Sequence, residues 1–386
     1  MKHSRFVSIV LSIALIAMMC IPCGALAADD TITLGLITPE TGEVAVYGLA
    51  VLNGTRLYID QLNAAGGING KQVVLIDYDD KGDATEAMNA YNKLVYSDEI
   101  DALLGPVTST PTFGVAEASA YDNVPGISAT ATHPDVTTYG DNYFRSCFED
   151  PFQGGTICAF AANELEAKTA AIIYNNGDSY SIGLKDAFTA RAAEEGLNIV
   201  ATESYAKDDV DFKAQLTNIV ELNPDVIFLP DYYNTVYVIC SQARDLGYTG
   251  TFLGVDGADG LLEIEGADAN VVEGMYFPNH YSTQSDSEIT QSFIQSYTET
   301  YGAAPNSFAA LAYDSAMIMC DAIARAENDG ATINGEESYQ AIIDAIYETE
   351  IEGATGHITF DENGNPIKTV CIIQITGGEY VFWGTY

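Results

Sequence analysis

Residues 105–134 read GPVTSTPTFGVAEASAYDNVPGISATATHP and contain two Ser/Thr-rich loops. Each loop follows a short apolar run, at 100–104 and 124–128, that is typical of a buried strand. The first loop leads into a helix, in which we expect Pro111 at the first position. Ser and Thr at a helix start satisfy free backbone N–H groups, and the same groups bind anions. The two loops therefore predict either ordinary helix caps or a cradle for a carboxylate or phosphate.

Strands and helices alternate in two series along the chain, which is typical of parallel sheets covered by helices on both faces. The expected fold class is α/β, with two doubly wound, Rossmann-like lobes. In such sheets ligands bind at the carboxyl ends of the strands, and two facing lobes form a cleft. The expected strands are 31–38, 71–77, 100–104, 124–128, 169–176, 197–205, 225–230, 251–255 and two or three within 357–386; the expected helices are 47–64, 84–96, 155–166, 181–195, 211–222, 235–246, 285–301, 307–327 and 336–347.

The N-terminus has the pattern of a secretory signal peptide, residues 1–27. Basic residues precede an apolar stretch at 6–19, and an Ala-Leu-Ala cleavage site follows. We therefore expect an exported protein that begins at residue 28. A lipid anchor on Cys20 or Cys23 is the less favoured alternative, because neither cysteine follows a small residue.

Composition excludes some classes of partner. The 15 basic and 55 acidic residues give a formal net charge of −40, and nucleic-acid binding needs a basic surface. No segment after the signal peptide reaches the ~20 apolar residues of a membrane span. Two of the seven cysteines lie in the signal peptide, and the remaining odd number is not a disulfide framework. A Cys147–Cys158 disulfide stays open as an alternative.

The sequence contains no clear catalytic, cofactor or metal motif. The histidines form no helical pair for zinc, and no G-x-S-x-G segment is present. GGING at 66–70 ends a helix, and GVDGADG at 254–260 has the wrong spacing for a dinucleotide loop. A partial calcium loop around Asp79 has Met88 where a bidentate Glu is required. We expect no enzyme, no cofactor and no metal, with a hydrolase that uses paired carboxylates as a remote alternative.

Polar and aromatic residues follow several expected strands, where the two lobes would face each other. Asp256 directly follows one strand, Tyr180 lies in the loop after another, and Tyr232 and Tyr233 follow a third. Tyr47 opens the first helix. An α-amino acid matches this set, with its carboxylate at the Ser/Thr loops, its ammonium at the acid and its side chain among the tyrosines. Because neither loop contains Lys or Arg, a carboxylate is favoured over a phosphate.

Several segments occur in an order that is typical of one known family. They include TGEVAVYG from residue 41, LNAAGGINGKQVVLIDYDD from 62, YFRSCFEDPFQG from 143, LGYTGTFLGVDG from 246 and TGHITFDENGNP from 355. On these segments the chain resembles the Liv-type substrate-binding proteins of branched-chain amino-acid ABC transporters, which are type I periplasmic binding proteins. The resemblance covers nearly all of the chain after the signal peptide.

The resemblance implies a clamshell whose two lobes are joined by a three-strand hinge. The chain would cross between lobes near 144–146, 275–277 and 355–357. One lobe would then consist of residues 28–145 plus 276–356. The other would consist of residues 146–275 plus 357–386.

The resemblance also implies a set of ligand-binding residues. The carboxylate site falls on Ser109, Thr130 and Thr132, and the ammonium acceptor falls on Asp256. The aromatic walls fall on Tyr47, Tyr180, one of Tyr232 or Tyr233, and Phe308.

Three positions depart from the family pattern. Asp256 stands where a longer Glu is usual, Thr130 replaces a usual Ala, and Asp231 stands where a small residue such as Gly is common. The last two add polarity near the ligand, which makes Asp231 a candidate specificity residue and puts a branched-chain ligand in question.

The implied function is capture of an amino acid, branched-chain or related, between two closing lobes. The loaded protein, expected to be a monomer in the periplasm or at the cell surface, would deliver the ligand to a membrane permease driven by an ATPase. One alternative is a clamshell that senses amides or aromatic carboxylates, and the other is the exported hydrolase.

Overall fold

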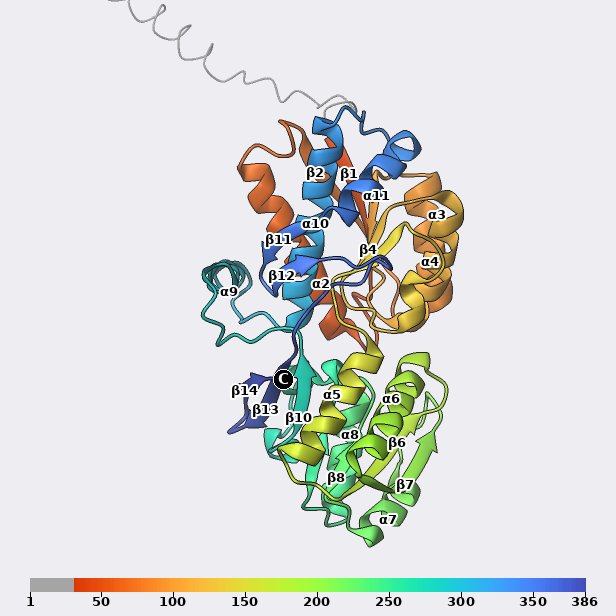
Figure 1. The fold of residues 1–386 in the computed structure, drawn as a ribbon, viewed down its shortest axis with the longest axis vertical. Helices are drawn as coiled ribbons and strands as arrows, with labels where there is room; N and C mark the ends of the chain where they lie inside the picture. The colour runs from red at the N-terminus through yellow and green to blue at the C-terminus, as the bar shows by residue number, and fades with distance from the viewer. Residues whose placement is uncertain (1–30) are drawn as a thin grey trace, which may run out of the picture. The chain divides into compact units, whose positions relative to one another are not determined.

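The computed structural model describes residues 31–386, and the predicted signal peptide with Cys20 and Cys23 lies outside the described residues. A five-stranded sheet forms the centre of the first lobe, in the order β2-β1-β3-β4-β5 (Figure 1). Strands β1, β3, β4 and β5 pair in parallel. The strands are β1 (Thr31–Thr38), β2 (Gln72–Asp79), β3 (Ala102–Leu104), β4 (Gly126–Ser128) and β5 (Tyr143–Arg145).

A seven-stranded sheet forms the centre of the second lobe, in the order β14-β13-β10-β9-β8-β6-β7. Strands β7, β6, β8, β9 and β10 pair in parallel, in this order across the sheet. The two C-terminal strands, β13 and β14, add an antiparallel edge. The strands are β6 (Thr169–Asn175), β7 (Asn198–Tyr205), β8 (Val226–Phe228), β9 (Thr251–Leu253), β10 (Tyr276–Asn279), β13 (Cys371–Thr376) and β14 (Glu379–Thr385).

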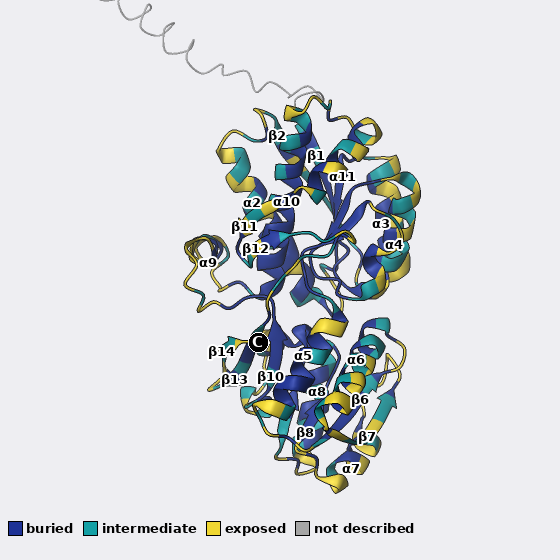
Figure 2. Cartoon of the chain, viewed as in Figure 1, coloured by how far each residue is buried: buried dark blue, intermediate teal, exposed yellow. Residues whose placement is uncertain are grey.

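Helices cover both sheets, and the expected α/β fold class is confirmed. In the first lobe, α2 packs on α10 and α3 packs on α4, on opposite sides of the sheet; in the second lobe, α5 packs on α6 and α7 on α8 (Figure 1). Figure 2 shows buried strands and helices whose outer faces are exposed. The helices are α2 (Ala45–Ala64), α3 (Ala84–Tyr96), α4 (Ser109–Asp122), α5 (Asp150–Asn163), α6 (Ser179–Glu195), α7 (Lys213–Leu222), α8 (Tyr233–Asp245), α9 (Glu288–Tyr301), α10 (Ser307–Asn328) and α11 (Tyr339–Tyr347).

Local sequence explains where the regular helices begin and end. The side chain of Asp83 accepts hydrogen bonds from the N–H groups of Thr85 and Glu86 and so caps the start of α3. Gly196 and Gly302 end α6 and α9 in the left-handed conformation, which glycine adopts without a steric penalty.

The start of α4 differs from the expectation. The helix begins at Ser109, with Thr108 as the N-cap, so Pro111 is its third residue rather than its first. A proline is tolerated there because the first N–H groups of a helix have no partner within the helix. The shift places Ser109 itself in the first turn.

Strand pairing also moves two of the implied lobe boundaries. Strand β10 pairs with β9 and β13, so residues 276–279 belong to the second sheet, not to the first lobe. After the two-stranded β11 (Glu350–Gly353) and β12 (Gly356–Thr359), the chain stays beside β5, where the Arg145 N–H donates to the carbonyl of Gly364. The chain therefore rejoins the second sheet at β13, which begins at Cys371, rather than at residue 357 as the resemblance implied.

Two other expectations concern cysteines and apolar segments. The five cysteines of the described chain are free thiols, so the alternative Cys147–Cys158 disulfide is not formed. Helix α10 is long and apolar enough to cross a membrane by length and composition, which the sequence analysis did not anticipate. However, 78% of its most apolar window is buried inside the protein, as expected for a core helix.

A buried carboxylate fastens the β11–β12 turn to α10. The Asp314 side chain, fully buried on α10, accepts hydrogen bonds from the N–H groups of Ala354 (2.6 Å) and Thr355 (2.9 Å) and from the Thr355 hydroxyl (2.6 Å). The same hydroxyl accepts a hydrogen bond from the Lys368 ammonium. The segment that leads back to the second lobe is therefore anchored on the core of the first.

We predict that Asp314→Ala lowers the free energy of unfolding by about 3 kcal/mol, because buried N–H groups lose their acceptor. The measurement is urea-induced unfolding of the mature chain followed by circular dichroism. Exposed Glu117 on α4 supplies the control, and Glu117→Ala should leave the unfolding midpoint in place. Equal midpoints for the two variants would contradict the anchoring role.

Candidate functional site

Seven of the nine predicted ligand-binding residues line one small cavity between the lobes. The cavity encloses about 220 Å³, including space open to solvent. Its walls come from the loops after β3 and β4 and from α10 in the first lobe, and from the segments after β6, β8 and β9 in the second. The lining residues are Val107, Thr108, Ser109, Thr130, Thr132, Tyr180, Tyr232, Asp256, Gly257 and Phe308.

The two Ser/Thr loops meet on one wall of this cavity. The Thr130 hydroxyl donates to the carbonyl of Val107 (2.7 Å) and so joins the loops to each other. The Ser109 hydroxyl accepts a hydrogen bond from the N–H of His133 (3.3 Å). The Thr132 hydroxyl is buried and has no hydrogen-bond partner among the described residues. Together with the first turn of α4, this wall suits a carboxylate.

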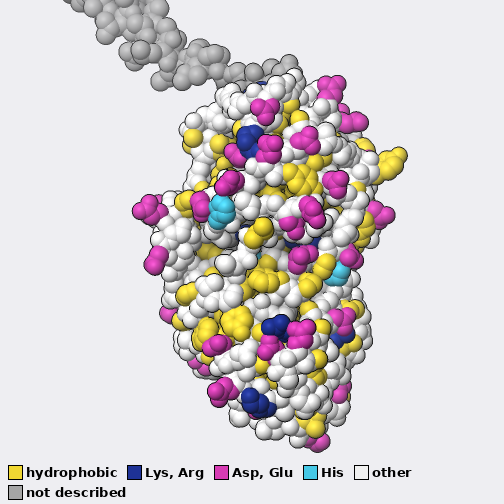
Figure 3. Space-filling view, in the orientation of Figure 1, with side chains coloured by type: hydrophobic (Ala, Val, Ile, Leu, Met, Phe, Trp, Pro, Cys, Tyr) yellow, Lys and Arg dark blue, Asp and Glu magenta, His cyan; other side chains and the backbone are white. Residues whose placement is uncertain are grey.

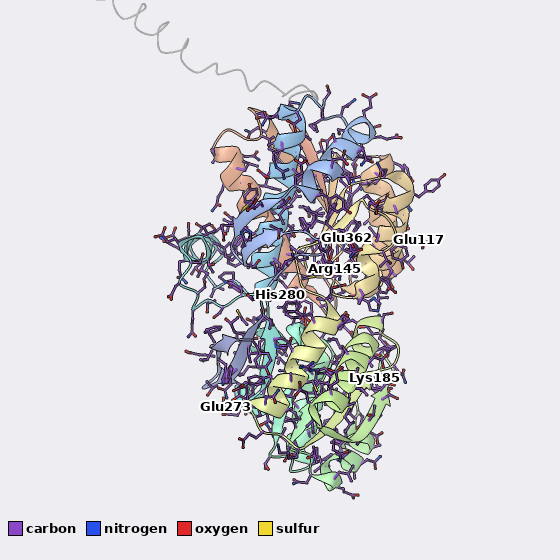
Figure 4. The ribbon with its side chains drawn as sticks, in the orientation of Figure 1. Glu117, Arg145, Lys185, Glu273, His280 and Glu362 are labelled. Atoms are coloured by element: carbon purple, nitrogen blue, oxygen red, sulfur yellow. The ribbon has the colours of Figure 1, made fainter. Side chains whose placement is uncertain are left out.

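A buried arginine shapes the second loop from behind. Figure 4 shows Arg145, which ends β5. Its guanidinium donates to the carbonyls of Ala131 (3.1 Å), His133 (2.9 Å) and Pro134 (3.0 Å). Sequence reasoning missed this role, because the arginine lies outside both loops. Its charge and its hydrogen bonds hold the segment that presents Thr132.

Asp256 forms the opposite, acidic wall. One oxygen of its carboxylate accepts hydrogen bonds from the Tyr180 hydroxyl (2.5 Å) and the Gln153 side-chain amide (2.9 Å). The other oxygen lies 3.5 Å from Nε2 of His280. Burial lowers the pKa of the His280 imidazole, so it is neutral at pH 7. The buried carboxylate thus has neutral partners and no fixed cation.

A second buried carboxyl group, Asp150, shares the Gln153 amide with Asp256, at 3.0 Å. Burial raises the pKa of Asp150 to about 8. Asp150, Gln153 and His280 were not among the predicted site residues. The first two lie within the quoted segment YFRSCFEDPFQG, which was the available signal.

Aromatic rings form two stacked pairs around the cavity. Tyr180 stacks on Tyr232 with ring centroids 4.9 Å apart, and Phe308 stacks on Tyr47 at 4.1 Å. Tyr180, Tyr232 and Phe308 line the cavity, whereas Tyr47 lies behind Phe308. Of the two alternatives Tyr232 and Tyr233, the first is in the wall.

Tyr47 and Tyr233 instead connect the two lobes. The Tyr47 hydroxyl donates to the carbonyl of Gly257 and accepts from the N–H of Tyr233. The Tyr233 hydroxyl donates to the carbonyl of Glu43 at 2.9 Å. These contacts across the cleft describe a closed arrangement of the lobes.

Gly257 is required next to the acidic wall. A Cβ atom at this position would lie 2.9 Å from both the Asp231 carbonyl oxygen and the Tyr180 hydroxyl. Real Cβ atoms do not approach other atoms so closely, so a larger residue would displace the tyrosine that orients Asp256.

Asp231 does not line the cavity that holds the other predicted residues. It is buried, and its carboxylate accepts hydrogen bonds from the Tyr205 hydroxyl and the Tyr232 N–H (2.7 Å). Its side chain belongs to the wall of a neighbouring cavity, which also includes Tyr232. No group of three or more His, Cys, Asp or Glu residues that could hold a metal occurs within 31–386.

Comparisons with known proteins agree with this architecture. Residues 31–379 match the family model described as periplasmic binding protein. The Leu/Ile/Val-binding protein BraC3 of Rhizobium johnstonii is 32% identical over 343 residues, which cover 88% of this chain and 89% of that protein. The crystal structure of the leucine binding protein LivK of Thermotoga maritima is 32% identical, with a TM-score of 0.84 over 92% of this chain and 98% of that one.

The substrate-binding protein LivJ of Streptococcus pneumoniae, solved with isoleucine, is also 32% identical. Its TM-score is 0.83, over 92% of this chain and 98% of that one. The resemblance inferred from the sequence is thereby confirmed. This chain belongs to the periplasmic binding protein family and is similar to the substrate-binding proteins of branched-chain amino-acid ABC transporters.

Proposed function

We propose that this protein binds an α-amino acid between its lobes after export and delivers it to an ABC permease driven by an ATPase. One observation carries the proposal: the buried carboxylate of Asp256 faces a wall of Ser/Thr hydroxyls across a single cavity. Similarity to proteins named for binding leucine, isoleucine and valine supports it. Export and the permease partner rest on the signal-peptide pattern and on the family.

The two walls suit the two charged groups of an amino acid. The carboxylate accepts hydrogen bonds from Ser109, Thr132 and the first turn of α4, while the ammonium donates to Asp256. Burial of an ammonium without a partner is costly, so the acid selects amino acids over plain carboxylic acids. Tyr180 and Gln153 hold the acid in place before the ligand arrives.

Closure of the two lobes around the ligand follows because the Ser/Thr wall belongs to the first lobe and the acidic wall to the second. A ligand shifts the balance between open and closed forms only as far as it binds the closed form better. An amino acid that first binds the hydroxyls of the first lobe gains the contacts to Asp256 and the tyrosines only on closure. Periplasmic binding proteins close around ligands by a hinge motion, which this arrangement uses. The closed, ligand-bound form is then the form that binds the permease.

We predict that Asp256→Ala weakens binding of the preferred amino acid at least about 100-fold, because the ammonium loses a charged partner. Isothermal titration calorimetry measures the affinity after a thermal-shift screen of the common amino acids has found that ligand. Exposed Asp286 provides the matched control, since it lines neither cavity and Asp286→Ala removes an equal charge. Unchanged affinity in Asp256→Ala would refute the ammonium assignment.

Replacement of Ser109 and Thr132 by alanine together should weaken binding by about 2–4 kcal/mol, at 1–2 kcal/mol for each hydrogen bond to a charged group. The double variant should also lose the ability to distinguish an amino acid from its carboxamide. Calorimetric titration with both compounds tests this. A double variant that still discriminates against the carboxamide would show that the carboxylate lies elsewhere.

Tyr47→Phe removes one hydroxyl that joins the lobes and leaves the stacking on Phe308 intact. Because its hydrogen bonds exist only in the closed form, we expect faster ligand release and about tenfold weaker binding. Stopped-flow fluorescence of ligand dissociation measures the rate. An unaltered rate would mean that these bonds do not stabilise closure.

A further inference from the structure

A second cavity adjoins the first and shares part of its wall. Thr108 and Tyr232 line both cavities. The second cavity encloses about 520 Å³, including space open to solvent, and reaches the exposed residues Glu43 and Lys207. It therefore extends from the proposed amino-acid site toward the edge of the cleft.

Among the charged residues in the walls of this second cavity, acidic residues outnumber basic ones. Asp178 and Asp231 are both buried, at 8% and 2% exposure, and both belong to the cavity wall together with Asn175. Lys207 is the single cation in the wall, and neither aspartate forms an ion pair within the described chain.

The hydrogen bonds of the two aspartates come from neutral donors. The Asp178 carboxylate accepts from the Thr110 hydroxyl at 2.8 Å, across the cleft. The Asp231 carboxylate accepts from the Tyr205 hydroxyl and the Tyr232 N–H. A carboxylate has about four acceptor sites, so both groups can accept further hydrogen bonds. Burial without a cation raises the pKa of Asp231 to about 7.

A ligand with an apolar side chain would fit the second cavity poorly. It would separate buried carboxylates from water and give them no hydrogen bond in return, which is costly. A hydrogen-bond donor, and a cation above all, could bind both aspartates and offset part of their negative charge.

We propose that the ligand is an α-amino acid whose long side chain passes Thr108 and Tyr232 and ends in an amine or guanidinium, bound in the second cavity by Asp231 and Asp178. This inference rests on the proposed function, because the α-carboxylate and α-ammonium occupy the first cavity. It changes the substrate class from branched-chain to basic amino acids.

The test compares ligands of similar length on the mature full chain. Calorimetric titration with arginine, lysine and ornithine is set against norleucine, leucine and citrulline, the uncharged analogue of arginine. We expect the best basic amino acid to bind at least about tenfold more tightly than norleucine and leucine, with citrulline between them. Tighter binding of leucine than of every basic amino acid would overturn the inference.

Variants of the two aspartates then test whether the second cavity binds the ligand's side chain. Asp231→Asn should reduce the preference for the basic amino acid over norleucine at least about tenfold, and Asp178→Asn should reduce it as well. The thermal midpoint of each ligand-free variant checks folding, and Asp286→Asn is the control with equal loss of charge. A preference that survives in both variants would overturn the assignment of the second cavity.

The outcomes separate this inference from the proposed function. If leucine or isoleucine binds best and Asp256→Ala removes that binding, the function stands and the second-cavity inference is wrong. If no amino acid binds, while an amide or aromatic carboxylate does, the proposed function fails and the inference fails with it.

Discussion

The closed site is organised around one constraint, the burial of the Asp256 carboxylate with neutral hydrogen-bond donors and no fixed cation. A buried carboxylate is tolerated when hydrogen bonds replace its water, which the Tyr180 hydroxyl and the Gln153 amide provide. These donors orient the group but leave its charge unbalanced. The ammonium of the proposed amino-acid ligand would balance that charge.

The Ser/Thr wall on the opposite side of the cavity would have to stabilise a negative charge. Neither Ser/Thr loop contains a cation, yet both approach the place proposed for a carboxylate. Arg145 resolves this difficulty, because its guanidinium is buried behind the second loop and donates to three of the loop's carbonyls. The arginine fixes the backbone and adds positive charge without contact to the cavity, whose lining does not include it. On the face drawn in Figure 3, acidic side chains are more numerous than basic ones.

Much of the fold could be predicted because long apolar patterns determine it. The bounds of β1 and α3 match the sequence prediction residue for residue. Strands β5 and β10 were missed as strands because three or four residues carry too little periodicity, and pairing with neighbours defines them. The same effect moved the lobe boundaries, since β10 belongs to the second sheet through its pairing alone.

The site shows a similar division between what chain order reveals and what packing adds. Parallel topology brings strand ends together, so Thr132 and Asp256 could be placed at one cleft from their positions after strands. Gln153 and Asp150 lie in the first turns of a helix, where polar residues are commonly exposed. Only their contacts bury them: Gln153 packs against Asp256, and the Asp150 N–H donates to the carbonyl of Thr132 in the first lobe. Asp231 shows the limit most clearly. Its position after β8 predicted a place at the cleft, but the direction of its side chain, into a neighbouring cavity, depends on Tyr205 and Tyr232. In the proposed site, the direction of this one side chain would separate recognition of the constant part of an amino acid from recognition of its side chain.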